Sequence, residues 1–204
     1  RTIPVTAFPD ADPVPRQGSR QLFAVAEGRL VRESEGTAPG TNLIVAPGIA
    51  KAATGAVRSD AVAAAAVTAD RANVLLAPLT ESTVTTVLTG AGFGRPNFDR
   101  HGALWVADAE GTLRVAGHDG SWQVVDLGTL GEGKVQAFRL APDAARIAIV
   151  IARPSGARVL GVARVDRDGD SVQVQDWREV SVTTTPVSQA SVIDVGWRTP
   201  ESLL

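Results

Sequence analysis

The feature that most constrains this fold is a repeat of short apolar segments, spaced about 41 residues apart. Each segment contains an apolar strand end, a short polar turn and a second apolar strand. Their anchors are Val57, Phe98, Leu140 and Trp197. Two periods before Leu104 lies Leu22, in another segment of the same kind. A period of this length with several short strands in each unit is typical of β-propeller blades.

Residues 134–150, KVQAFRLAPDAARIAIV, show the pattern most clearly. The residue before Pro142 is disfavoured in the α region, so a strand and a turn are predicted there. The run RIAIVIA that follows is short and β-branched, which favours a second strand. This strand has no polar face. A propeller explains that, because the second strand of a blade lies between two neighbouring blades and is covered on both sides.

We therefore predict an all-β chain: a β-propeller of four-stranded antiparallel blades with a repeat of about 41 residues, forming an incomplete part of a larger propeller. Residues 1–19 are expected to be a linker or a stray edge strand, and residues 20–204 the propeller. The expected blades are 20–50, 51–90, 91–130 and 131–185, with the start of the next at 190–204. The expected innermost strands are 52–59, 95–100, 134–141 and 191–197.

Residues 61–69 leave an alternative open. Their alanines favour a helix, which Ser59 and Asp60 could cap. The register of the repeat favours a strand, with small side chains where a neighbouring blade approaches. The side chains predicted to be almost fully buried are Leu104, Val106, Ile147, Ile149 and Ile151. Core or inter-blade packing is predicted for Trp105, Trp122, Trp177 and Trp197.

The composition excludes several kinds of function and site. The 20 basic residues nearly balance the 22 acidic ones, which argues against nucleic-acid binding by bulk charge. The chain has no cysteine, so it can form neither a disulfide nor a thiolate metal site. No stretch reaches the roughly 20 apolar residues that a membrane-spanning helix needs.

Two histidines, His101 and His118, lie in turns on the same predicted face of one blade. A metal site there would need a third ligand from Asp99, Asp108 or Asp119. Solvated turns explain both histidines without a metal.

Two further patterns resemble ligand loops. Asp166, Asp168 and Asp170 alternate as in a calcium loop, but Ser171 and Trp177 stand where that motif requires glycine and glutamate. An Asp-Gly hairpin explains the segment. The glycine cluster at 90–95 is expected to be a tight crossing between blades rather than a phosphate cradle. We expect no metal and no organic cofactor at these positions.

A candidate partner-binding face follows from the loops that join the blades. Lys51 and Lys134 are the only lysines, and Arg95 lies at a similar place before a predicted strand. Such loops gather around the mouth of a propeller channel, where the three cations would favour an acidic partner. Ordinary solvated loop charges remain the alternative. The apolar residues expected to be exposed beside these cations are Ile49, Phe93 and Leu130.

The stretch RLAPDAARIAIVI…RVLGVARVDRDGD, followed by VIDVGWRTPESLL, resembles the C-terminal β-propeller domain of LpqB-type actinobacterial lipoproteins. The similarity covers roughly residues 20–204 and departs from the family where Asp143-Ala144 replaces the usual Asp-Gly turn. It implies a protein lipid-anchored outside the cytoplasmic membrane, with an upstream GerMN-type domain. It also implies binding to the extracytoplasmic domain of an MtrB-type sensor histidine kinase, in a two-component system tied to cell-wall homeostasis.

Two classes of function remain in competition. The first is a non-enzymatic binding module that modulates the kinase, and the family implies no catalytic residues. The second is a propeller enzyme of the lactonase, quinoprotein or glycosidase kind acting on a small envelope-associated substrate. No pair of carboxylates is found at the starts of the predicted innermost strands, where glycosidase chemistry would need them. The sequence therefore favours the binding module.

Overall fold

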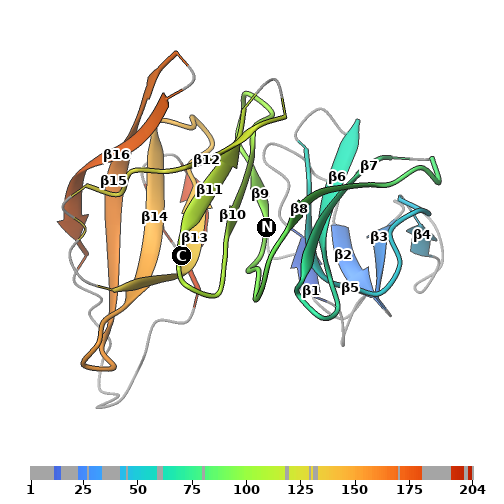
Figure 1. Cartoon of the computed structure of the whole chain (residues 1–204), viewed down its shortest axis with the longest axis horizontal. Helices are drawn as coiled ribbons and strands as arrows, with labels where there is room; N and C mark the ends of the chain where they lie inside the picture. Colours follow the sequence, from blue (N-terminus) through green and yellow to red (C-terminus); the bar gives the residue numbers. More distant parts are fainter. Residues whose placement is uncertain are drawn as a thin grey trace. The chain divides into compact units, whose positions relative to one another are not determined.

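The computed structural model describes part of the chain, and all structural statements below concern that part. The described residues are 12–14, 23–26, 28–33, 42–44, 46–58, 62–79, 81–117, 120–128, 130, 133–169, 171–180, 194–199 and 202–203. They divide into two compact units, residues 1–98 and 99–204. Every regular element in the described ranges is a β-strand (Figure 1).

The first unit contains two antiparallel sheets in which each strand pairs with its neighbour in sequence. The first sheet consists of β1 (Asp12–Val14), β2 (Phe23–Ala26), β3 (Arg29–Glu33) and β4 (Asn42–Ile44). The second consists of β5 (Ala52–Val57), β6 (Ala63–Thr68), β7 (Asn73–Pro78) and β8 (Thr85–Thr89). Each sheet is a four-stranded meander, the form expected of a propeller blade.

The same order continues in the second part of the chain. The third sheet consists of β9 (Asn97–Phe98), β10 (Leu104–Ala107), β11 (Leu113–Ala116) and β12 (Trp122–Val124). The fourth consists of β13 (Lys134–Leu140), β14 (Arg146–Ala152), β15 (Arg158–Asp168) and β16 (Ser171–Glu179). The last sheet is a hairpin of β17 (Trp197–Thr199) and β18 (Ser202–Leu203). The chain is a partial β-propeller, as the repeat predicts.

One turn geometry recurs at the hairpins and explains their sequences. In each, the N–H of the fourth turn residue donates to the carbonyl oxygen of the first, and the fourth residue has φ between 57 and 84. Glycine is favoured at such positive φ because it has no Cβ. The fourth residues are Arg71, Gly102, Gly111, Gly120, Ala144 and Gly156. Only Arg71 and Ala144 among these six carry a side chain in the left-handed conformation.

The strand β14 is apolar on both sides because it is covered on both sides. Ile147, Ile149 and Ile151 face a core shared with the sheet β9–β12. Ala148 and Val150 face a second core that includes residues around the β17–β18 hairpin. All five side chains are at most 2% exposed, and of the two other aliphatic residues predicted to be almost fully buried, Val106 is 0% and Leu104 4% exposed. The prediction of a strand buried between two neighbours is confirmed.

The structure also settles details of the elements. Residues 63–68 form the strand β6, so the helical alternative for 61–69 is wrong. Pairing with neighbouring strands outweighs the helix propensity of alanine there. The first sheet begins at β1, inside the segment predicted as linker or edge strand. The strand expected at 95–100 is only two residues long, and the one expected at 191–197 begins at Trp197, residues 191–193 lying outside the described ranges.

All four tryptophans lie on strands, as predicted. Trp105 is fully buried, and Trp177 and Trp197 pack at the edges of two cores. Within the described ranges no helix has the length and apolar character needed to cross a membrane.

Candidate functional site

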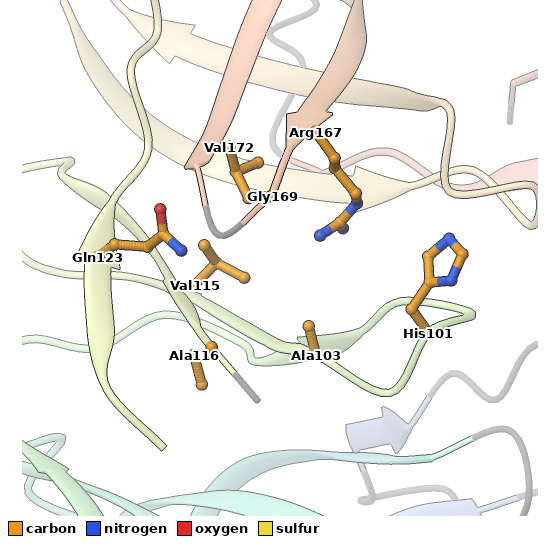
Figure 2. A pocket seen from close by; sticks show the side chains of 9 residues that line it. His101, Ala103, Val115, Ala116, Gln123, Arg167, Gly169 and Val172 are labelled. Carbon is orange, nitrogen blue, oxygen red and sulfur yellow. The ribbon is translucent and has the colours of Figure 1, made fainter. Parts of the chain in front are cut away.

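A cavity of about 270 Å³ lies in the second unit, between the sheet β9–β12 and the β15–β16 hairpin (Figure 2). The β9–β10 turn, the strands β11 and β12 and the hairpin all contribute to its wall. Its lining residues are His101, Ala103, Val115, Ala116, Gly117, Gln123, Arg167, Gly169 and Val172. Polar side chains on an otherwise apolar wall are the usual composition of a small-molecule site.

Asp99 forms the buried polar support of this cavity. It directly follows β9, where its Oδ1 accepts hydrogen bonds from the backbone N–H groups of His101 (2.8 Å) and Ala103 (3.0 Å). Its Oδ2 accepts from Trp105 Nε1 at 2.9 Å and from Arg167 Nη2. The Asp99 side chain is 0% exposed. Four donors therefore satisfy both carboxylate oxygens, as a buried charge requires.

Arg167 reaches this carboxylate from the other sheet. Its guanidinium carbon lies 5.4 Å from the centre of the Trp105 ring, within the range of a cation–π contact. The side chain is 27% exposed and projects into the space between His101 and Gln123 (Figure 2). The pair Asp99–Arg167 thus links two neighbouring blades and also fixes a cation at the cavity.

Strand alternation decides which charges face the cavity. Arg167 pairs with Val172, and Val165 pairs with Val174, so these four side chains share the face turned toward the core. Asp166 and Asp168 occupy the alternate positions and are exposed. Asp166 pairs with Arg164 at 3.2 Å on that outer face. No acidic residue is among the cavity's lining residues.

Two of the acids considered for metal binding, Asp99 and Asp108, have other roles. Both oxygens of Asp99 are occupied by the four donors above. Asp108 Oδ1 closes the β10–β11 turn by accepting from the N–H groups of Glu110 (3.0 Å) and Thr112 (2.9 Å), and Arg114 pairs with its Oδ2 at 3.3 Å. Across the described ranges, no three acidic, histidine or cysteine side chains are grouped as metal ligands.

Three of the candidate ligands, His118, Asp119 and Asp170, lie outside the described residues. Asp168 pairs with Ser171 at the end of the β15–β16 hairpin, and Gly169 has φ 57, which agrees with the Asp-Gly turn explanation. The absence of a metal and of a cofactor at these positions stays a prediction.

The glycine cluster at 90–95 forms the tight crossing predicted for it. Gly92 has φ 62, and a Cβ added to Gly90 would lie 2.8 Å from the Phe93 ring. The N–H of Phe93 donates to the carbonyl oxygen of Arg71, and Arg71 Nη1 donates to the carbonyl oxygen of Phe93 at 2.9 Å. The loop is held against the hairpin that contains Arg71.

The candidate partner-binding residues divide into exposed and buried ones. Lys51 and Lys134 are exposed, as expected. Lys134 Nζ lies 2.9 Å from Glu110 Oε2, and Arg95 Nε donates to Thr54 Oγ1 at 3.2 Å. The expected exposure of Ile49, Phe93 and Leu130 is wrong: they are 0%, 1% and 3% exposed. These large apolar side chains fold under their loops because burying each stabilises the fold by about 1.5–3 kcal/mol.

Lys51 and Lys134 occupy equivalent places in the repeat. Each lies at the start of a blade, where its backbone is close to a turn glycine of the preceding blade. The glycine is Gly28 for Lys51 and Gly111 for Lys134. A Cβ on these glycines would lie 2.9 Å from the Lys51 Cα and 2.6 Å from the Lys134 Cα. Lys51 itself has φ 57, which is unusual for a residue with a side chain.

The pKa of Asp143, in the β13–β14 turn, is shifted by its turn. Burial opposes its ionisation, but hydrogen bonds from Arg146 and from the Ala145 N–H outweigh burial and lower the pKa of the carboxyl. Asp143 therefore stays ionised and closes the turn that carries Ala144 where the resembled family has glycine. Its role is structural.

The sequence offered one signal for the cavity, and it was missed. Along β15 and β16 the inward positions are apolar except at Arg167, so the alternation places a charge on the core face. Such a residue requires a buried partner. The partner, Asp99, lies 68 residues away in sequence, and no local pattern connects the two.

Comparison with known sequences gives a family. A family model described as "Lipoprotein LpqB beta-propeller domain" matches residues 28–204. Lipoprotein LpqB from Cutibacterium acnes is 27% identical over 218 residues, which cover 97% of this chain and 36% of that protein. Lipoprotein LpqB from Streptomyces coelicolor is 39% identical over 83 residues, covering 39% of this chain and 13% of that protein. The chain thus spans about a third of the length of the first relative.

Solved structures show the same fold at low identity. TolB from Acinetobacter baumannii has a TM-score of 0.62 and 12% identity, with 80% of this chain and 42% of that chain covered. A putative TolB from Agrobacterium tumefaciens has a TM-score of 0.61 and 19% identity, covering 80% and 60%. A gluconolactonase from Xanthomonas campestris has a TM-score of 0.60 and 15% identity, covering 95% and 73%. At these identities the likeness concerns the fold alone.

Proposed function

The chain belongs to the LpqB β-propeller family, and on that premise we propose that it is a non-enzymatic binding module of a membrane-anchored envelope lipoprotein. Its proposed partner is the extracytoplasmic domain of an MtrB-type sensor histidine kinase, whose signalling in cell-envelope homeostasis it modulates. The lipid anchor belongs to the extracytoplasmic side of the cell membrane in this proposal. Both relatives are named as lipoproteins, and neither name is that of an enzyme.

The observation that carries a binding role is how three acidic side chains of the second unit are used. Asp99, Asp108 and Asp143 each accept hydrogen bonds from the backbone of their own turn and pair with an arginine. General acid–base catalysis needs a carboxylate within hydrogen-bonding reach of a substrate. These carboxylates are instead occupied in closing turns, which supports recognition over chemistry.

The proposed docking residues are the two equivalent lysines. Lys51 and Lys134 are exposed at the entry to β5 and β13, on loops whose apolar residues Ile49 and Leu130 are buried. Buried loop residues fix the backbone, so each ammonium group is presented from a supported position. Arg95 contributes from the equivalent loop while it donates to Thr54. An acidic surface on the kinase domain would complement these cations.

The test measures binding of the purified kinase domain to this chain at low salt. The variant Lys51→Glu/Lys134→Glu is compared with Arg29→Glu/Arg178→Glu, which makes the same charge change at exposed strand positions, one in each unit. We expect the lysine variant to bind about tenfold more weakly and with a smaller salt dependence. The arginine variant should bind like the wild type.

The possible results of this experiment distinguish an error in the proposed partner from an error in the proposed docking residues. If the wild-type chain does not bind the kinase domain at low salt, the proposed partner is wrong. If it binds and the lysine variant binds equally well, the partner stands and the docking face is wrong. Equal melting temperatures for the three proteins ensure that binding, and not folding, has been compared.

A further inference from the structure

We propose that the cavity lined by His101, Gln123 and Arg167 binds the carboxylate of a ligand of about amino-acid size. This site is separate from the lysines proposed for kinase docking, and its ligand does not depend on that partner. Figure 2 shows the Arg167 guanidinium projecting into the hollow, with His101 on one side and Gln123 on the other. The argument rests on the donors, the charges and the size of the cavity.

Arg167 has a buried hydrogen-bond donor for which the protein supplies no acceptor. A guanidinium carries five N–H groups. Nη2 donates to Asp99, while Nε is buried without any partner. A buried donor without an acceptor is rare and calls for an explanation. An acceptor oxygen entering the cavity beside this guanidinium would supply one, after a small rotation of the side chain.

The guanidinium is held in place before any ligand arrives. Asp99 binds one edge of it, and the Trp105 ring lies 5.4 Å away. The Arg167 side chain is therefore already ordered in the folded protein, and binding a ligand does not add the entropic cost of ordering it. A planar guanidinium of this kind matches a carboxylate better than a lysine would.

The charges around the cavity favour an anion. Arg167 is the one formally charged residue in the lining, and no lining residue is acidic. Asp99 lies behind the guanidinium and is completely covered. The exposed acids of the hairpin, Asp166 and Asp168, occupy the alternate strand positions and face away. His101 adds a ring N–H in either neutral tautomer.

The size and the walls define the rest of the ligand. Drug-sized ligands occupy cavities of about 300–1,000 Å³. At about 270 Å³ this cavity is smaller, which suits a single amino-acid-sized group. Val115, Val172 and the alanines of the lining offer apolar contact to a small side chain. The predicted ligand is a carboxylate attached to a short apolar group.

The first experiment uses N-acetylalanine and its amide, which differ only in the carboxylate. Each is titrated into the isotopically labelled chain while backbone amide resonances are followed. We expect N-acetylalanine to shift the resonances of residues 101–103, 115–117, 123, 167–169 and 172, and N-acetylalaninamide to leave them unchanged. Equal shifts with both compounds, or no shift with N-acetylalanine at millimolar concentration, would overturn the proposal.

Variants then identify the groups that bind. We expect Arg167→Gln to weaken N-acetylalanine binding by about tenfold or more, since a hydrogen bond to a charged group is lost. The matched control is Arg164→Gln on the outer face of the same strand, which should bind normally. Arg167→Gln leaves Asp99 without its cation, so a variant that keeps this pair is also needed. Ala103→Leu fills the cavity and should abolish binding, and normal binding by folded Ala103→Leu would contradict the proposal.

A second pair of ligands identifies the source of the carboxylate. Tetra-alanine with a free C-terminus represents a peptide end, and its C-terminal amide is the control. Binding of both N-acetylalanine and the free peptide supports a site that accepts a carboxylate at the end of a longer chain. Binding of N-acetylalanine alone supports a free small molecule. Binding of the amidated peptide as tightly as the free one would show that the carboxylate is not what the cavity recognises.

Discussion

The same place in two blades is built from alanine in one and isoleucine in the other. β6 and β14 are both buried second strands, and their pairing registers correspond: Ala64 pairs with Val57 as Ile147 pairs with Leu140. On one face the two strands are alike, with Ala65 and Val67 in β6 and Ala148 and Val150 in β14. On the other face Ala64 and Ala66 stand where β14 has Ile147 and Ile149.

The difference lies on the face that each strand turns toward the preceding blade. In the first unit, the core next to Ala64 and Ala66 is filled by large side chains from outside β6, namely Leu30 and Ile49, which are fully buried. In the second unit the isoleucines meet Trp105 and the other members of the core. Packing density in protein interiors is nearly constant, so small residues on one sheet require large ones or a closer approach from its neighbour. The second interface also holds the Asp99–Arg167 pair, which gives it a polar link and a cavity.

Removing the buried carboxylate tests the polar link and should have the largest effect. We expect Asp99→Ala to lower the free energy of unfolding by about 3–5 kcal/mol, because it leaves Arg167 unpaired and Trp105 Nε1 without an acceptor. Denaturant unfolding measures the change. The control Asp166→Ala breaks an exposed ion pair on the outer face and should cost less than about 1 kcal/mol. Equal effects would mean that the inter-blade link contributes no more than a surface pair.

The general architecture could be predicted from the sequence because it depends on local patterns. The 41-residue spacing, the proline and glycine turns and the doubly apolar strands all appear within short windows. For the alanine-rich β6, whose residues prefer a helix, the repeat register favours the strand that the structure has, although the sequence leaves the helix open. Register carries information that propensity alone lacks.

The cavity and the loops could not be predicted in the same way. Asp99 and Arg167 are brought together only by the tertiary fold. The alternation of apolar and polar residues at 165–174 shows that Arg167 is a charged residue on the core face, but it does not indicate which residue pairs with it. The glycine-rich loops were interpreted as exposed, yet Ile49, Phe93 and Leu130 are buried. A short loop at a sheet edge can point a large apolar side chain toward the core. The spacing of residues in the sequence does not show whether such a side chain points toward the core or toward solvent.

Truncating an isoleucine of β14 tests the apolar part of the comparison. Ile149→Ala gives β14 the residue that β6 has at Ala66, but without the neighbours that fill the space. We expect the free energy of unfolding to fall by about 2–5 kcal/mol, through lost burial and the cavity left behind. Thermal or urea unfolding checks this. A loss below that of an exposed truncation such as Val124→Ala would show that this core rearranges freely.

The reverse exchange tests whether the first interface is tight. Ala66→Ile places a β14 residue in β6, where Gly55 is the cross-strand partner and the Leu30 side chain lies close to that glycine. We expect the free energy of unfolding to fall by about 1–3 kcal/mol, since the added atoms force neighbours from their preferred rotamers. A gain in stability on the same unfolding measurement would mean that the interface in the first unit contains unfilled space.

The smallest expected effect concerns Lys51, and its sign is opposite. Lys51 has φ 57 and Gly92, one period later, has φ 62, so the two blades use the same left-handed position with and without a side chain. Glycine fits this conformation without steric cost, and Lys51→Gly should raise the free energy of unfolding by about 0.4–1 kcal/mol. The proposed docking role predicts that the same change weakens binding of the kinase domain. Ala144→Gly, also at φ 57, provides the control, because it should stabilise by a similar amount without altering binding. If Lys51→Gly is more stable and binds the kinase domain as tightly as the wild type, the strained lysine does not have the docking function proposed for it. If Lys51→Gly is more stable and binds more weakly, the protein keeps a strained backbone at residue 51 because the lysine charge there is needed for binding.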